Sequence, residues 1–404
     1  MKFKYLVIKF VVIATFLHFF TAPFSFAVQK TEVVYQDSYV HGLSSLHFYL
    51  HEYTKNLSSD SDEDKQIVFS DLEVKRLWNK VFHGASLSLN DCDELALLKK
   101  AKQWYKKGVF QVQAGLIKQA QSTLENSYNA LEKLLNLVLE KETGDYFLEE
   151  LRDKKMQSIK DPNIKNNPYL SDDMIREMAP YLLPIRHHKR KILDSIFLEK
   201  RVTTNKTTFY DAGFRTIAKG PRSFILVAKH PKIPRYLVKA HLDTQLTKKY
   251  KKDSWEWLAR RCEGARKIRE IIRRRKIRFF TVPEKRIYCL PADPSPPDDA
   301  NHTRHIAILL VTDMQLTSEN ENHHAWRNVM TQEHLNELYE IIVRAKGSSY
   351  RPDNIAYTIH RTFAFIDTEY PSKGPDFKSI RHFLNSEMRD YWEWLIRNGG
   401  PSSP

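Results

Sequence analysis

The sequence predicts an α+β protein in two parts, an N-terminal helical domain followed by a domain that mixes strands with helices. The chain has 404 residues, which exceeds one typical domain. Apolar residues recur at helical spacing between residues 116 and 138, and neither glycine nor proline interrupts this stretch. Beyond residue 200, short runs of β-branched and aromatic residues alternate with turn residues. With 42% apolar and 28% charged residues, the bulk of the chain has the composition of a globular protein.

The first 27 residues have the pattern of an export signal. Lysines occupy positions 2, 4 and 9, residues 10–20 are nearly all apolar, and Ser25 and Ala27 offer small side chains for cleavage. Pro23 leaves the apolar run shorter than the ~20 residues that a spanning helix needs. We therefore expect a signal peptide at residues 1–27 and an exported protein without a transmembrane segment after cleavage. An uncleaved membrane anchor is the alternative.

Residues 28–65 are predicted to form a polar linker, because the acidic stretch at 58–64 has no periodic apolar face. The helical domain is expected at residues 70–200. Its long helix is expected to end near Gly144, and Ser171 precedes a further helix in the position of an N-terminal cap.

The predicted elements of the second domain alternate between strands and helices. Pro231 and Pro234 separate the first two strands, which favours a hairpin. The strands are expected at residues 224–227, 236–238, 279–282, 287–290 and 306–311, and the helices at 254–275 and 332–344.

The most informative residues are Asn354, in the polar turn Pro-Asp-Asn, and Asp367, at the end of a strand-like run. An amide and a carboxylate at such places supply the hard oxygen ligands that magnesium prefers. At these residues the sequence resembles the protein-kinase-like superfamily, whose catalytic loop ends in Asn and whose metal-binding Asp follows two short strands later.

The resemblance implies a bilobed protein-kinase-like domain at residues 205–398, with ATP and Mg²⁺ as cofactors and an unknown protein or small molecule as phosphate acceptor. It assigns Asn354 and Asp367 to the metal. It also makes Lys239, which ends a Tyr-Leu-Val-Lys strand, the phosphate-pairing lysine, and Glu263 its helix partner. Nucleotide contacts are expected at Lys239 and at two hinge residues, Asp313 and Met314.

The sequence departs from the family at three places, of which the mildest is that Thr368 and Glu369 follow Asp367 where the family has Phe and Gly. The position of the catalytic aspartate, five residues before Asn354, is Ser349. The loop that covers the phosphates in the family lacks its glycines here, because only Gly213 and Gly220 fall between residues 210 and 224. A catalytically inactive, pseudokinase-type interaction module therefore stands beside the phosphotransferase as the alternative function.

A third and less favoured function is a zinc metallopeptidase. The motif His241-Leu242-Asp243-Thr244 resembles the first metal-ligand motif of dinuclear zinc aminopeptidases. Such sites also need a downstream Glu-Glu pair, and none follows residue 243.

The run Arg266–Arg278 has eight basic residues and a single acid. We expect it to offer a contact to an anionic surface. No specific nucleic-acid motif accompanies it.

Overall fold

The computed structural model describes residues 39–57, 67–88, 92–158, 160–165, 167–218, 225–246, 251–347, 350–369 and 374–401. The expected signal peptide, most of the loop between the first two strands, and Ser349 lie outside these residues. The chain divides into two compact units. The helical unit consists of Met1–Leu139 with Tyr391–Pro404, and the mixed unit is Glu140–Asp390. None of the described helices is long and apolar enough to cross a membrane.

The division differs from the expected domains at 70–200 and 205–398. Residues 140–200 belong to the mixed unit, because Leu193 and Phe197 pack in the same apolar cluster as the strand residues Val238 and Leu310. Helical spacing favoured assigning this segment to the preceding domain, yet the apolar face of its residues 193–197 is buried against the sheet.

In the helical unit the expected polar linker at 28–65 is wrong for residues 39–57, and its residues 28–38 and 58–65 lie outside the described part of the chain. Residues 39–56 are helical and carry fully buried leucines at positions 43, 46 and 50, which is the spacing of one helix face. The acidic residues that follow this helix lowered the average hydrophobicity of the whole stretch. The other helices of this unit are α2 (Asp71–Ser88), α3 (Cys92–Gln113), α4 (Ile117–Ser158, which extends into the mixed unit) and the end of α11 (Ser386–Asn398).

The long helix α4 does not end at Gly144 as expected but continues to Ser158. A single glycine within a helix costs only about 1 kcal/mol relative to alanine, and the next proline is Pro162. The expected cap at Ser171 is confirmed, since its side chain accepts a hydrogen bond from the Met174 amide at the start of α5 (Asp172–Met178).

The mixed unit is built on a five-stranded antiparallel sheet of order β1-β2-β3-β6-β5. The expected hairpin is present as β2 and β3. A smaller sheet has the order β4-β8-β7. The strands are β1 (Arg215–Ala218), β2 (Leu226–Lys229), β3 (Tyr236–Ala240), β4 (Phe280–Thr281), β5 (Lys285–Cys289), β6 (Ala307–Thr312), β7 (Ile355–Tyr357) and β8 (Phe363–Phe365).

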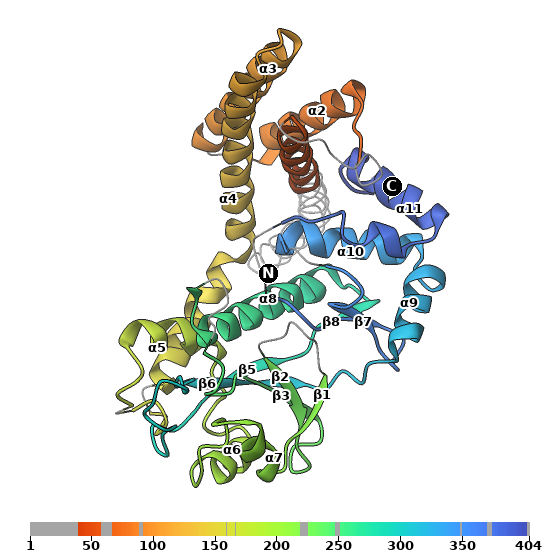
Figure 1. Cartoon of the computed structure of the whole chain (residues 1–404). Coiled ribbons are helices and arrows are strands. Elements are labelled where there is room, and N and C mark those ends of the chain that lie inside the picture. The colour runs from red at the N-terminus through yellow and green to blue at the C-terminus, as the bar shows by residue number, and fades with distance from the viewer. Residues whose placement is uncertain are drawn as a thin grey trace, which may run out of the picture. The chain divides into compact units, whose positions relative to one another are not determined.

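Helices cover both faces of the large sheet, with α8 on one side and α6 and α7 on the other (Figure 1). Strand alternation sorts the side chains: Val238 points to the α6 and α7 face, and Leu237 points to the α8 face. The helices of this unit not yet given are α6 (Arg190–Phe197), α7 (Lys206–Asp211), α8 (Ser254–Arg275), α9 (Glu319–Asn328) and α10 (Gln332–Ala345).

Candidate functional site

Two lysines of the large sheet point to the face that α8 covers. Lys239 on β3 and Ile287 on β5 both pair with Leu309 of β6, and Lys285 lies two residues before Ile287. Because side chains alternate along a strand, Lys239 and Lys285 share the face of Leu309. Lys285 is buried, with 4% of its surface exposed, and Lys239 is half-buried.

Both lysines converge on the segment that follows β8. The Lys285 ammonium donates to the carbonyl oxygen of Ile366 at 3.2 Å and to the hydroxyl of Thr368 at 2.8 Å. The Lys239 ammonium reaches the same Ile366 carbonyl at 3.5 Å. Residues 366–369 therefore form a carbonyl- and carboxylate-bearing strip beside two cations.

Helix α8 holds this strip from the other side. The Arg261 guanidinium donates to the carboxylate of Glu369 at 2.5 Å and to that of Asp367 at 3.4 Å. The Thr368 hydroxyl donates to the Arg261 carbonyl at 2.6 Å. Gly264 permits this close approach, because a Cβ at that position would overlap the Thr368 carbonyl oxygen.

The charges of the site act on one another. Burial alone would raise the pKa of Asp367, but the positive charges of Arg261, Lys239 and Lys285 outweigh it and lower this pKa to about 2. Burial lowers the pKa of Lys239 against the attraction of Asp367. Burial also lowers the pKa of Lys285 well below its usual range, and the neighbouring charge of Lys239 lowers it further. Burial thus disfavours the charged form of both lysines, and an anion bound beside them would favour it.

Asn354 and Asp367 lie side by side. The backbone carbonyl of Asn354, just before β7, accepts hydrogen bonds from the amides of Ile366 at 2.9 Å and Asp367 at 3.4 Å. Lys239, Asn354 and Asp367, which are far apart in the sequence, are thus brought together. Asp353 belongs elsewhere, because it is exposed and forms an ion pair with Arg351 at 3.4 Å.

The expected pair of Lys239 with Glu263 is wrong. Glu263 forms an ion pair with Lys267 one turn along α8, at 2.9 Å. A step of two residues turns a helix by about 200°, so the helix residue that faces the site is Arg261 instead.

The two expected hinge residues follow β6 directly. Asp313 forms an ion pair with Lys229 of β2 at 2.9 Å, and its amide donates to the Arg235 carbonyl. Its carboxylate therefore joins the end of β2 to the segment after β6. Met314 next to it is partly exposed.

The sequence patterns assigned no role in the site to four of its residues: Arg261, Lys285, Thr368 and Glu369. Strand alternation could have revealed Lys285, since it lies two residues before the buried Ile287 and therefore on the same face. The expected strand began at 287, which left this lysine outside it.

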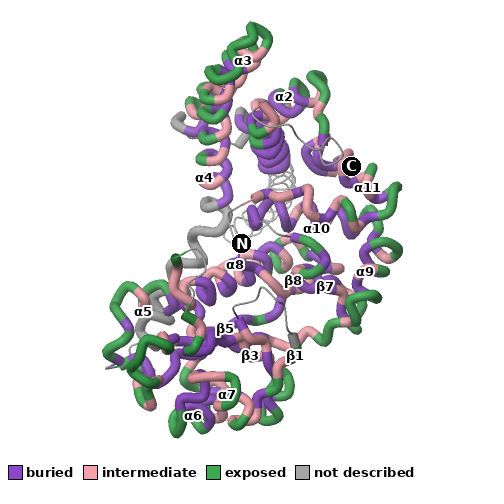
Figure 2. Tube along the Cα trace, in the orientation of Figure 1, coloured by how far each residue is buried: buried purple, intermediate pink, exposed green. Residues whose placement is uncertain are grey.

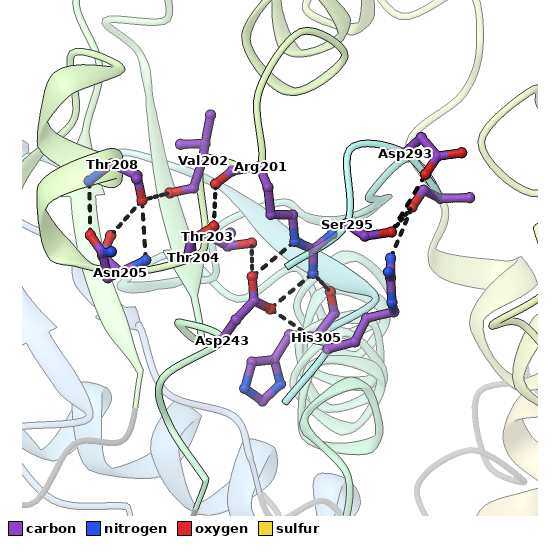
Figure 3. A network of polar contacts seen from close by, with 12 residues as sticks. Arg201, Val202, Thr203, Thr204, Asn205, Thr208, Asp243, Asp293, Ser295 and His305 are labelled. Atoms are coloured by element: carbon purple, nitrogen blue, oxygen red, sulfur yellow. Dashed lines mark hydrogen bonds and ion pairs between the residues drawn. The ribbon is translucent and has the colours of Figure 1, made fainter. Parts of the chain in front are cut away.

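The metallopeptidase motif has a structural explanation (Figure 3). The Asp243 side chain is fully buried, and both of its oxygens bind Arg201, at 2.8 and 2.9 Å. The Thr203 hydroxyl and the His305 amide also donate to it. In the described part of the chain no three His, Cys, Asp or Glu residues gather where they could hold a metal ion. Asp243 thus serves as a buried ion-pair partner, contrary to the zinc expectation.

Much of the basic run at 266–278 is neutralised within the mixed unit. Arg273 and Arg274 pair with Glu270 of the same helix. Arg275 pairs with Glu340 of α10. Its positive surface is therefore weaker than the composition indicates, and contact with an anionic surface stays a prediction.

Comparisons with models of protein families, with curated proteins and with solved structures found no match to this chain.

The charges around Asp367 predict how the stability of the protein depends on pH in acid. The folded-state pKa of Asp367 is about 2, below its usual value of 3.8. As the pH falls, Asp367 is therefore protonated in the unfolded chain before it is protonated in the folded one. The stabilisation of the folded state by the ionised Asp367 carboxylate is complete above about pH 4 and is lost as the pH falls towards 2. We expect the stability advantage of wild type over Asp367→Asn to shrink by about 2 kcal/mol between pH 5 and pH 2. Urea unfolding of wild type and Asp367→Asn at both pH values measures this stability difference. A difference that stays constant with pH would contradict this electrostatic account.

Proposed function

We propose that the mixed unit is a kinase-like domain that binds a nucleoside triphosphate with Mg²⁺ at the site of Lys239 and Asp367. The observation that carries the proposal is that the Lys239 ammonium donates to the carbonyl of Ile366, the residue directly before Asp367. A lysine on the third strand and an aspartate after a short hairpin are the parts that the family resemblance assigns to phosphate and metal.

The order of the elements supports the same proposal. The large sheet has four consecutive antiparallel pairings, and α8 follows β3 before the chain enters β5 and β6. The segment with Asp313 and Met314 then leaves the sheet towards α9 and α10, and β7 and β8 follow. This succession agrees with a smaller strand-rich lobe, a hinge and a second lobe.

Asp367 and Asn354 are suitable ligands for magnesium that is already bound to nucleotide phosphates. Magnesium takes few protein ligands, and Asp367 with Asn354 would supply a carboxylate and an amide oxygen. Three cationic side chains surround Asp367, which disfavours a bare divalent cation. A metal-nucleotide complex carries net negative charge and would be attracted. The metal would supply charge neutralisation on the phosphates, while Lys239 would hold them in place.

A second candidate is a nucleotide-independent interaction module. Arg261 favours it, because this side chain already pairs with Asp367 and Glu369 and so competes with a metal for the Asp367 carboxylate. In that case the ion pairs would serve only to fasten the strip 366–369 to α8.

Binding measurements separate the two candidates. For the full chain, we expect ATP with Mg²⁺ to raise the melting temperature, while Mg²⁺ alone leaves it unchanged. A ligand at a hundred times its dissociation constant stabilises the folded state by about 2.7 kcal/mol. Lys239→Met should weaken nucleotide binding by at least about tenfold, because it removes a charge-assisted contact to phosphate.

Glu263→Gln is the matched control, because Glu263 lies on α8 but pairs outside the site. It should bind ATP as wild type does. Equal shifts in wild type and Lys239→Met, or no shift in wild type, would contradict the proposal. Binding without formation of ADP would identify an inactive, pseudokinase-type module.

A further inference from the structure

The hairpin of α3 and α4 in the helical unit has an unusual charge distribution. From Leu95 to Leu124 the sequence contains six lysines and no aspartate or glutamate. The lysines are at positions 99, 100, 102, 106, 107 and 118. Residues 95–124, which lie between Glu94 and Glu125, therefore carry only positive charge at the end of the hairpin where the two helices meet.

The end of this hairpin, residues 110–117, also exposes large apolar side chains. Phe110 is 69% exposed, Leu116 46% and Ile117 38%, and all three lie within eight residues. Figure 2 shows exposed residues at this end of α3, whereas the inner faces of both helices are buried. We call residues 110–117 the hairpin tip.

The hairpin tip is held in a defined shape. Gly108 packs so closely on Leu124 that a Cβ would overlap that side chain, and the Ser127 hydroxyl donates to the Ala101 carbonyl at 2.8 Å. At the turn, Gly115 has φ of 74°, and the Leu116 amide donates to the Gln111 carbonyl at 2.8 Å. This pattern is a Schellman cap. The turn thus places Leu116 in solvent, although the residue at this cap position frequently packs on its own helix.

We propose that the hairpin tip binds the surface of a membrane that contains anionic lipids. Lys106 and Lys107 lie one turn before Phe110, about 5 Å along the helix, and Lys118 follows Ile117. This spacing lets Phe110, Leu116 and Ile117 enter the boundary between headgroups and acyl chains while the lysines stay among the phosphates.

A lipid surface fits these features better than a protein partner does. The apolar residues lie on the turn at the end of the hairpin. A fluid lipid surface can therefore contact them from several sides. The uniform positive charge matches a uniformly negative surface, and flexible lysines reach phosphates without a fixed geometry. The proposal is independent of any activity of the mixed unit.

A fluorophore on the tip tests the proposal in the full chain. Gln113→Cys, an exposed position on the tip, is labelled with an environment-sensitive dye in a Cys92→Ser background, since Cys262 and Cys289 are buried. We expect a blue shift with vesicles of phosphatidylcholine and phosphatidylglycerol, and little change with phosphatidylcholine alone. The dye reports the tip, so membrane binding by other segments does not produce the shift.

Two variants and a control position make the test decisive. Replacing Lys106, Lys107 and Lys118 by glutamate should weaken the response about a hundredfold or more, since each lysine near the surface contributes about a factor of five to ten. Replacing the three apolar residues by serine should weaken it at least about tenfold. The same dye at Lys75→Cys, on exposed α2, should not shift.

Circular dichroism must show that both triple variants are folded. The matched apolar control replaces Val68 and Leu72 by serine, because these residues are 71% and 76% exposed but lie outside the hairpin tip. Equal shifts on neutral and anionic vesicles would overturn the proposal. So would a shift that appears on self-association without vesicles, or no shift on anionic vesicles.

Discussion

Replacing Arg201 by methionine is expected to lower the free energy of unfolding by about 3–5 kcal/mol, because it leaves a buried carboxylate without its counter-ion. Asp243 is fully buried and its ion pair with Arg201 has two hydrogen bonds. Arg201 also donates to the His305 carbonyl at 2.6 Å. The pair thus joins three segments of the chain that are distant in sequence, and urea unfolding followed by circular dichroism measures its loss.

Two further variants establish the cause. Arg201→Met combined with Asp243→Leu should regain much of the lost stability, because a buried ion pair can often be replaced by apolar side chains at little cost. Arg176→Met should change stability by less than about 0.5 kcal/mol, since its pair with Asp173 is exposed on both sides. A loss below about 1 kcal/mol for Arg201→Met would contradict the assigned role.

Local patterns in the sequence predicted much of the mixed unit. The helix at 254–275 has the same bounds in the structure, and the strands near 236 and 306 are within two residues of their expected places. These elements have strong caps or continuous apolar runs. The boundary at residue 200 could not be predicted in the same way, because it depends on which distant surface the helix face of Leu193 and Phe197 covers.

The candidate site was predicted in part. Lys239, Asn354 and Asp367 were identified through the family resemblance. Lys285 was missed because the expected strand began at residue 287, and Arg261 was missed because its place depends on how α8 packs on the sheet. On α8 the buried Leu258, Cys262 and Ala265 define the face towards the sheet, and Arg261 lies beside that face. Glu263, the helix partner that the resemblance assigned, lies on a face of α8 that is not next to Lys239.

Gly264→Ala is expected to destabilise the mixed unit by about 1–3 kcal/mol, although alanine favours helices by about 1 kcal/mol over glycine. The added methyl group would overlap the carbonyl oxygen of Thr368, so α8 or the strip 366–369 must move. Movement would strain the hydrogen bond from Thr368 to the Arg261 carbonyl and the ion pair of Arg261 with Glu369. Urea unfolding measures the loss, and hydrogen exchange of the Ile366 and Asp367 amides should speed up.

Glu263→Ala is the matched control for this substitution. It lies next to Gly264 on α8, but its side chain leaves the site and pairs with Lys267, so its loss should cost only about 0.3–0.5 kcal/mol. If Gly264→Ala instead stabilises the protein, as alanine does at an open helix position, the strip 366–369 does not pack on α8 as closely as described. The cluster of Lys239, Lys285, Arg261 and Asp367 would then lose its geometric basis, because α8 would not hold Arg261 against Asp367.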